Sequence, residues 1–266
     1  MADKILLFIP MYNCEKQIPR VLGQINAENK HFFTEIIVVN NRSTDHGEEA
    51  VENFCAQHPD LPIKLLRNDA NYGLGGSHKV AFDYAVKHQF DYVIVLHGDD
   101  QGDISNLVPY LASKEYAKYD CFLGARFMKG SKLQGYSKFR TFGNYVYDFL
   151  FTLGVGFKVY DLGSGLNMYK TSILKDRFFE KYKDNLMFNY CMIMGASYYH
   201  HTRKFFPIIW RESDQVSNVK LTSQAITVLK MLASFVCNRK KFMQAEHREN
   251  PVQHYTAQQI YPKEAK

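Results

Sequence analysis

The stretch VIVLHGDDQGDI, residues 93–104, joins an apolar run to a cluster of acidic residues. The run has the length and composition of a buried strand, and it ends at His97. In an open α/β sheet, ligands bind where the strands end, so the loop that follows is a candidate site. Four potential metal ligands lie in it: His97, Asp99, Asp100 and Asp103. His97 and Asp99 could bind one divalent cation, with the other two as further oxygen donors. A polar turn that caps the next helix explains the same residues without a ligand.

Composition limits the class of protein. The chain has 266 residues, of which 46% are hydrophobic, and this is enough for one large domain or two small ones with a packed core. A net charge of +6 suits a phosphate-rich ligand or an anionic membrane surface, but it is mild for a protein that binds nucleic acid. We therefore expect no nucleic-acid partner.

Targeting signals and cysteines favour a cytoplasmic protein. The five cysteines have no CxxC spacing, so neither a zinc ribbon nor a disulfide framework is indicated. The N-terminal apolar run is too short for a signal peptide. No stretch of about 18 apolar residues predicts a spanning helix. We expect a cytoplasmic location, with contact at the inner face of the membrane left open.

Alternation of strands and helices indicates the fold class. Apolar runs at 4–10, 35–39, 63–67 and 92–96 are each followed by a segment with helical periodicity. This order predicts an α/β fold with a mostly parallel central sheet flanked by helices. All the strand exits then lie at one rim.

A glycine-rich segment, NYGLGGSHK at 71–79, begins the third helix. A helix N-terminus with free backbone N–H groups favours phosphate, and Lys79 would add a positive charge. The glycines, Gly76 among them, are explained equally well by a tight turn.

Six segments in order resemble the family 2 glycosyltransferases of the GT-A fold, and among these the dolichyl-phosphate mannose synthase-like branch. The resemblance runs from residue 4 to about residue 221. The segments are FIPMYN (8–13), IIVVNNRSTD (36–45), NYGLGGSHKVAFDYA (71–85), HGDDQ (97–101), LGARF (123–127) and DLGSGLNMYK (161–170).

The resemblance implies transfer of a sugar from a nucleoside diphosphate donor, with Mn²⁺ or Mg²⁺ holding the diphosphate. It assigns the metal to His97 and Asp99. It assigns the nucleotide to Pro10, Tyr12, Asn13, Asn41, Gly76, Lys79 and Asp99. Three departures stand out: Asn40 and Asn41 replace two aspartates, Arg42 replaces a glycine, and His97 replaces the first metal aspartate. A histidine ligand shifts the preference toward Mn²⁺.

The second half supplies the candidate catalytic residues. The resemblance places Arg126 facing phosphate and Asp161 near the sugar and acceptor. Asp184 precedes Gly195 by eleven residues, the spacing of the family's base, although Lys183 replaces the usual glutamate. A solvated helix start is the equal alternative for Asp184, and an anionic acceptor such as a lipid phosphate needs no base. An aromatic stripe from Phe142 to Leu153 is predicted to lie in the core.

The C-terminal part is expected to form a lid, a helix and a tail. Arg211, Ser217 and Lys220 are the candidates for closing over the diphosphate, at the end of a glycosyltransferase domain at 1–221. An amphipathic helix at 222–245 carries basic residues at its end, and its apolar face could contact a membrane, the domain or a second subunit through 222–241. Residues 246–266 are predicted to be a polar, extended tail.

The leading hypothesis is an inverting, metal-dependent glycosyltransferase that uses a nucleotide sugar. Its acceptor would be a lipid phosphate or a surface glycan. Two alternatives stay open from the sequence: a nucleotidyltransferase, and a degenerate nucleotide-sugar-binding scaffold that has lost its chemistry.

Overall fold

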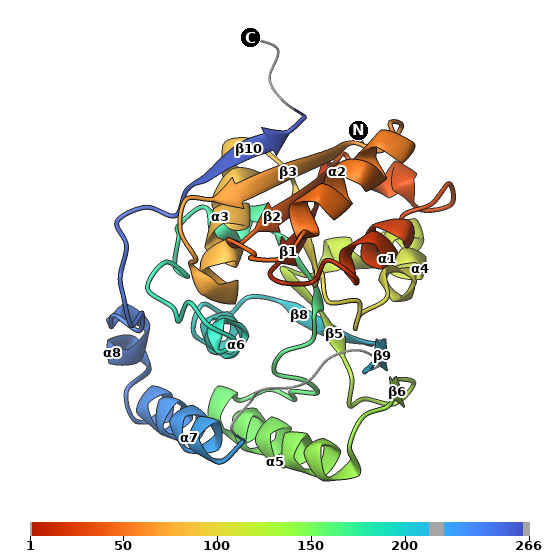
Figure 1. Ribbon diagram of the computed structural model, residues 1–266. Coiled ribbons are helices and arrows are strands. Elements are labelled where there is room, and N and C mark those ends of the chain that lie inside the picture. Colours follow the sequence, from red (N-terminus) through yellow and green to blue (C-terminus); the bar gives the residue numbers. More distant parts are fainter. Residues whose placement is uncertain (1, 213–220, 263–266) are drawn as a thin grey trace.

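The computed structural model describes residues 2–212 and 221–262, and its centre is an eight-stranded sheet (Figure 1). The strand order is β10-β3-β2-β1-β4-β7-β5-β8. The first four strands in sequence are β1 (Ile5–Met11), β2 (Glu35–Asn40), β3 (Ile63–Asn68) and β4 (Tyr92–Leu96). They pair in parallel, and Phe8 of β1, for example, lies opposite Ile37 on one side and Val95 on the other. The predicted α/β fold with a mostly parallel sheet is confirmed.

Beyond β4, the sheet continues with three strands of mixed direction. β7 (Leu166–Lys170) lies antiparallel between β4 and β5 (Cys121–Ala125), and β8 (Arg203–Pro207) runs parallel to β5. A separate pair joins β6 (Lys132–Gln134) to β9 (Ile209–Arg211).

Helices cover both faces of the sheet. α1 (Ile18–Gly23), α2 (Gly47–Gln57) and α4 (Val108–Ser113) pack on one face, while α3 (Gly73–Lys87) and α6 (Phe188–Tyr198) pack on the other. Side chains alternate along each strand, so β1 sends Leu6 and Phe8 to one core and Ile5, Leu7 and Ile9 to the other. Short 3₁₀ turns lie at Lys30–Phe32, Ile104–Asn106, Glu115–Lys118 and Thr171–Leu174.

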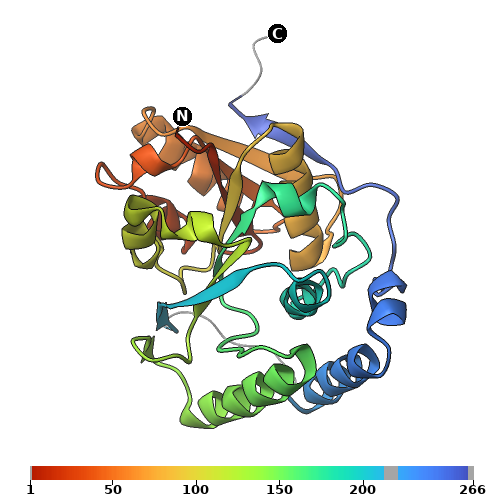
Figure 2. The ribbon, with the colours of Figure 1, turned by 180° about the vertical axis from the view of Figure 1, so that it is seen from behind.

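A pair of helices stands apart from these layers: α5 (Lys138–Val155) and α7 (Leu221–Cys237) lie side by side, with α8 (Arg239–Gln244) next in the chain (Figures 1 and 2). The aromatic stripe of α5 was predicted to lie in the core, and this prediction is wrong. Phe142 and Phe149 are 68% and 61% exposed, whereas Asp148 and Phe151 face inward. Both faces of this helix are rich in apolar residues, so periodicity alone could not identify the buried one.

The C-terminal residues differ from the expected helix and tail. The helical segment after residue 221 is broken at Asn238, whose side chain accepts a hydrogen bond from Lys241 N and begins α8. Residues beyond it return to the sheet, where β10 (Ala257–Tyr261) pairs antiparallel with β3. Tyr255 is buried on the way. Strand pairing uses backbone groups, so a polar sequence does not prevent it.

Across residues 2–212 and 221–262, no helix is both long and apolar enough to cross a bilayer. All five cysteines lie in these ranges, and none of them forms a disulfide.

Candidate functional site

A pocket of about 310 Å³ opens where β1, β2 and β4 end. Five of the predicted site residues line it: Pro10, Tyr12, Asn41, His97 and Asp99. The structure adds eight lining residues that sequence reasoning did not assign: Met11, Cys14, Asn71, Gly73, Leu74, Ser77, Gly98 and Leu186. The rim of the parallel strands therefore holds a pocket with one carboxylate and one imidazole among its described lining residues.

The backbone holds His97 and Asp99 in place. His97 N donates to Gly165 O at 2.9 Å, and Gly98 N donates to Pro10 O at 3.1 Å. A Cβ atom at position 98 would lie 2.7 Å from Pro10 O, so only glycine allows this approach. The loop after β4 is thus fixed against β1 and against the loop before β7.

The two side chains suit a divalent cation. Nε2 of His97 is enclosed and has no hydrogen-bond partner among the described residues, and Oδ1 of Asp99 accepts from Gln101 N at 3.2 Å. Burial lowers the pKa of His97 to about 4, and the charge of Arg126 contributes. The imidazole is therefore neutral, the state that binds metals. Burial raises the pKa of Asp99 to about 6, which leaves a carboxylate at neutral pH.

The neighbouring acids do not join them, contrary to the expectation of further oxygen donors. Asp100 pairs with Arg20 at 2.7 Å and also accepts from Gln24. Asp103 pairs with Arg211 and caps the turn at Ser105. The described residues contain no group of three His, Cys, Asp or Glu that could hold a metal. A cation here would have two protein ligands and would take the others from a bound diphosphate and water.

Asn41 lies in a network of amides that fixes its orientation. Its Oδ1 accepts from Tyr72 N at 2.8 Å and from Asn68 Nδ2 at 3.0 Å, and its Nδ2 donates to Asn71 Oδ1 at 2.7 Å. A carbonyl oxygen has two lone pairs, and these two hydrogen bonds use both lone pairs of Asn41 Oδ1. Asn41 can therefore offer a ligand one amide proton rather than an acceptor.

Asn13 does not line the pocket. Its Oδ1 accepts from Thr44 N at 2.8 Å, and its own N–H donates to Ser43 Oγ at 3.0 Å. This residue joins the loops that follow β1 and β2. It supports the pocket wall beside Tyr12.

Lys79 and Gly76, which the sequence assigned to the nucleotide, are not among the residues that line the pocket. Ser77 lines the pocket, and Lys79, two residues later, lies about 200° further around α3. The Lys79 side chain is 1% exposed, and its ammonium donates to Asp184 Oδ1 at 2.6 Å and to Tyr182 O at 2.7 Å. Burial lowers the pKa of Lys79, and the hydrogen bond and charge of Asp184 oppose this shift. Gly76 packs against Tyr72 and Tyr255.

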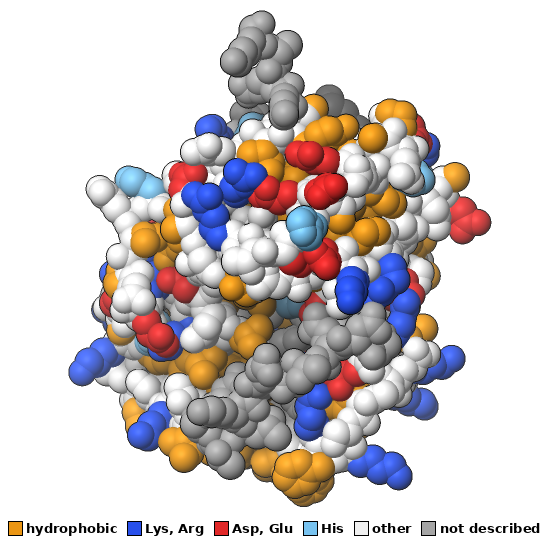
Figure 3. All heavy atoms as spheres, viewed as in Figure 1, with side chains coloured by type: hydrophobic (Ala, Val, Ile, Leu, Met, Phe, Trp, Pro, Cys, Tyr) orange, Lys and Arg blue, Asp and Glu red, His pale blue; other side chains and the backbone are white. Residues whose placement is uncertain are grey.

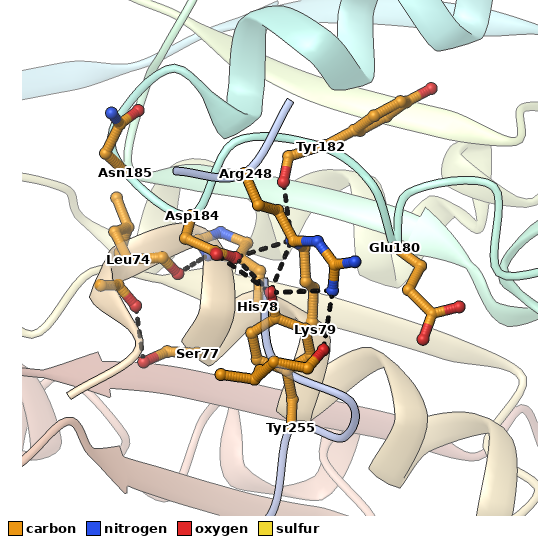
Figure 4. Close-up of polar contacts among 12 residues, drawn as sticks. Leu74, Ser77, His78, Lys79, Glu180, Tyr182, Asp184, Asn185, Arg248 and Tyr255 are labelled. Atoms are coloured by element: carbon orange, nitrogen blue, oxygen red, sulfur yellow. Dashed lines mark hydrogen bonds and ion pairs between the residues drawn. The ribbon is translucent and has the colours of Figure 1, made fainter. Parts of the chain in front are cut away.

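Asp184 belongs to the same buried cluster rather than to the pocket (Figure 4). Besides Lys79, its carboxylate accepts from Tyr255 OH at 2.8 Å and 2.9 Å. Its carbonyl accepts from Gly75 N at 2.7 Å, and a Cβ at Gly75 would lie 2.8 Å from the side chain of Phe188. The glycine-rich helix start therefore accommodates the protein's own chain, and the Asp184 carboxylate is committed to a lysine and a tyrosine.

Arg126 and Asp161 form a second buried pair. Asp161 accepts from Arg126 N, Nε and Nη2 at 2.8, 2.7 and 2.8 Å, and from Gly163 N at 2.9 Å. The guanidinium also lies 4.8 Å from the ring centre of Trp210. In this arrangement the charge of Arg126 is used by Asp161 rather than directed at a phosphate. Its charge still acts on the pocket: it adds to the lowering of the His97 pKa by burial, and it opposes the rise that burial causes in the pKa of Asp99.

The predicted lid is only partly described. Arg211 pairs with Asp103, and its N–H donates to Gln101 O at 3.0 Å. Ser217 and Lys220 lie outside the described residues. The Arg211 contacts link β9 to the loop that carries Asp99.

Asp148, on the buried side of α5, carries a carboxyl group whose protonation should make stability depend on pH. Its Oδ2 has no partner among the described residues, and burial together with Asp161 raises its pKa to about 8. The folded state therefore keeps a proton that an unfolded carboxyl group, with a pKa near 3.9, has already lost. Stability from this group is lost as the pH rises through the folded pKa. Between about pH 6.5 and 8.5, we expect unfolding free energy to fall by roughly 1–2 kcal/mol more than in Asp148→Asn. Urea unfolding at both pH values measures this difference, and equal slopes in the two proteins would contradict it.

Sequence comparison identifies the family. The sequence profile described as Glycosyl transferase family 2 matches residues 7–178, well over half of the chain. The chain belongs to glycosyl transferase family 2. Family 2 membership bears out the resemblance drawn from the six segments, and it makes this protein a glycosyltransferase.

Similar sequences include two transferases named for dolichyl or dolichol phosphate. The UDP-N-acetylglucosamine–dolichyl-phosphate N-acetylglucosaminyltransferase of Methanococcus voltae is 28% identical over 191 residues, covering 66% of this chain and 73% of that protein. The dolichol-phosphate mannosyltransferase of Pyrococcus furiosus is 24% identical over 137 residues, covering 52% and 37%.

Two solved structures share the fold of this chain. S. aureus TarS in complex with UDP-GlcNAc superposes with a TM-score of 0.59 at 19% identity, covering 88% of this chain and 67% of that one. The mannosyltransferase PcManGT of Pyrobaculum calidifontis, in complex with GDP-Man and Mn²⁺, gives 0.54 at 15% identity, covering 91% and 72%. At these identities the likeness concerns the fold alone.

Proposed function

We propose that this glycosyltransferase binds a nucleoside diphosphate sugar in the pocket at the ends of β1, β2 and β4. The observation that carries the proposal is that the Asp99 carboxylate and His97, whose Nε2 has no partner among the described residues, line the same pocket at the rim where such folds bind ligands. Tyr12, which is half exposed at the same rim, offers an aromatic surface for a base.

We further propose that the donor binds together with a divalent cation at His97 and Asp99. When bound, such a cation neutralises the charge that develops on the departing nucleoside diphosphate. The chain's own part is to present a neutral imidazole and a carboxylate, both held by backbone contacts. A solved structure of the same fold in complex with GDP-Man and Mn²⁺ supports the pairing of donor and cation, and one in complex with UDP-GlcNAc supports the donor class.

A lipid phosphate is the acceptor that the pocket favours. Asp99 is the one carboxylate that lines the pocket among the described residues, while Asp184 is paired with Lys79 and Asp161 with Arg126. A hydroxyl acceptor needs a base, whereas an anionic phosphate oxygen does not. That oxygen would attack the sugar's C1, and the bond from C1 to the nucleoside diphosphate would break, inverting the configuration. The named dolichyl-phosphate relatives support the same acceptor class.

Calorimetric titration with UDP, GDP and CDP, each with and without Mn²⁺, tests the proposed donor class. We expect one nucleotide to bind with an affinity that Mn²⁺ increases by roughly tenfold or more. Binding of none of the three, in the presence of Mn²⁺, would favour a scaffold that has lost its chemistry.

A further inference from the structure

The outward face of α5 carries an apolar stripe. Its members recur every three or four residues, so they share one side of the helix. They are Phe139, Phe142, Tyr145, Val146, Phe149 and Leu153, with exposed fractions from 42% to 77%. Asp148, Phe151 and Val155 occupy the buried side. This helix therefore shows solvent an apolar surface while its other side is already packed.

Helix α7 extends the stripe. Ile226, Leu229 and Val236 are 56%, 40% and 52% exposed, while Val228, Met231, Leu232 and Phe235 are buried. A Cβ at Gly154 of α5 would lie 2.6 Å from Leu232 Cδ1, so the glycine permits the close approach of the two helices. Arg239 also donates to Gly154 O at 2.8 Å. We call these nine side chains of α5 and α7 the α5–α7 face.

The clustering is marked. Nine of the twelve exposed large hydrophobic side chains in the described part of the chain belong to the α5–α7 face. Scattered apolar residues are ordinary on a protein surface, whereas a contiguous group indicates a surface that contacts a partner or a membrane.

The exposed charged residues of α5, α7 and α8 are all basic. Lys138, Lys230, Lys240 and Lys241 are exposed on α5, α7 and α8. The only acidic residue in the sequences of these three helices is Asp148, which is buried. In Figure 3, blue side chains lie on both sides of the orange areas at the bottom of the molecule. Two copies of this chain that met through the face would bring positive charges together, which opposes a homodimer.

We propose that the α5–α7 face docks on the surface of an anionic lipid bilayer. Helices with aromatic and aliphatic side chains on one side and lysines at the margins lie in the plane of the membrane interface. The apolar side chains would enter the headgroup region, and the lysines would contact anionic lipids. This docking goes beyond the proposed transfer reaction and does not depend on it. It would place α5, whose buried side contacts the Asp161 region, against the bilayer that contains a lipid acceptor.

Vesicle flotation tests the proposal with the full chain and no nucleotide. We expect it to float with phosphatidylcholine vesicles that contain about a third phosphatidylglycerol, and far less with pure phosphatidylcholine. Phe142→Ser/Phe149→Ser and Lys240→Glu/Lys241→Glu should each lower the partition coefficient by at least about tenfold. Lys87→Glu/Lys118→Glu, which makes the same charge change at exposed sites outside the face, should have little effect.

Folding and self-association are measured alongside. The two phenylalanines are exposed, so the serine variant should keep the wild-type Tm, and reduced flotation then reports the surface itself. Wild-type protein that does not bind anionic vesicles would overturn the proposal, as would full binding by the serine variant. A stable dimer in sedimentation that the serine variant dissociates would assign the face to a second copy instead. Because no nucleotide is present, these outcomes are distinct from failure of the donor titration.

Discussion

Replacing Asp99 with alanine is expected to abolish Mn²⁺-dependent nucleotide binding. Asp99 is the one carboxylate lining the pocket among the described residues, and it lies two residues from an unpartnered His97 nitrogen. Loss of the charge that would bind the cation should weaken affinity in Mn²⁺ to its Mn²⁺-free value, a loss of roughly tenfold or more. Calorimetry with and without Mn²⁺ measures the change.

Asp100 provides the matched control. Asp99→Asn and Asp100→Asn remove the same charge from adjacent positions, but Asp100 pairs with Arg20 and does not line the pocket. We expect Asp100→Asn to change the affinity by less than about threefold. The Tm of Asp99→Asn should not fall, because burial opposes the charged form of Asp99. Unchanged affinity in Asp99→Ala would exclude this site for the cation.

Replacing Lys79 or Asp184 is expected to destabilise the fold strongly. The Lys79 ammonium is 1% exposed, so its loss leaves the Asp184 carboxylate without its cation, and loss of Asp184 leaves a buried ammonium unpaired. Lys79→Met and Asp184→Leu should each lower the free energy of unfolding by about 3–5 kcal/mol. Urea unfolding at neutral pH measures both values.

The double variant separates a structural pair from a catalytic base. Lys79→Met/Asp184→Leu should cost roughly 1–3 kcal/mol less than the sum of the single changes, because neither charge is then left alone. Additive costs would contradict the pairing. Asp184→Asn that folds with wild-type stability but has no transferase activity would restore Asp184 as the base.

Sequence by itself determined the framework of this protein. Four apolar runs, each followed by a helical pattern, were enough to predict that β1 to β4 pair in parallel in one sheet, because strand and helix periodicities are local properties. The ordered segments from 8–13 to 161–170 were enough for the family. Polar residues at strand ends also pointed to the rim, where Tyr12, Asn41 and Asp99 line the pocket.

Only the tertiary structure decided which polar side chains face the pocket and which are paired inside the protein. Lys79 and Asp184 are 105 positions apart, and nothing in either local sequence shows that they meet. The position of Leu186 in the pocket wall and the pairing of β10 with β3 likewise depend on contacts between segments far apart in the sequence. Periodicity showed that α5 has an aromatic face, but the burial of its opposite side at Asp148 and Phe151 left that face to solvent. The physical reason is common to these cases: burial and pairing depend on segments that meet only after the chain has folded.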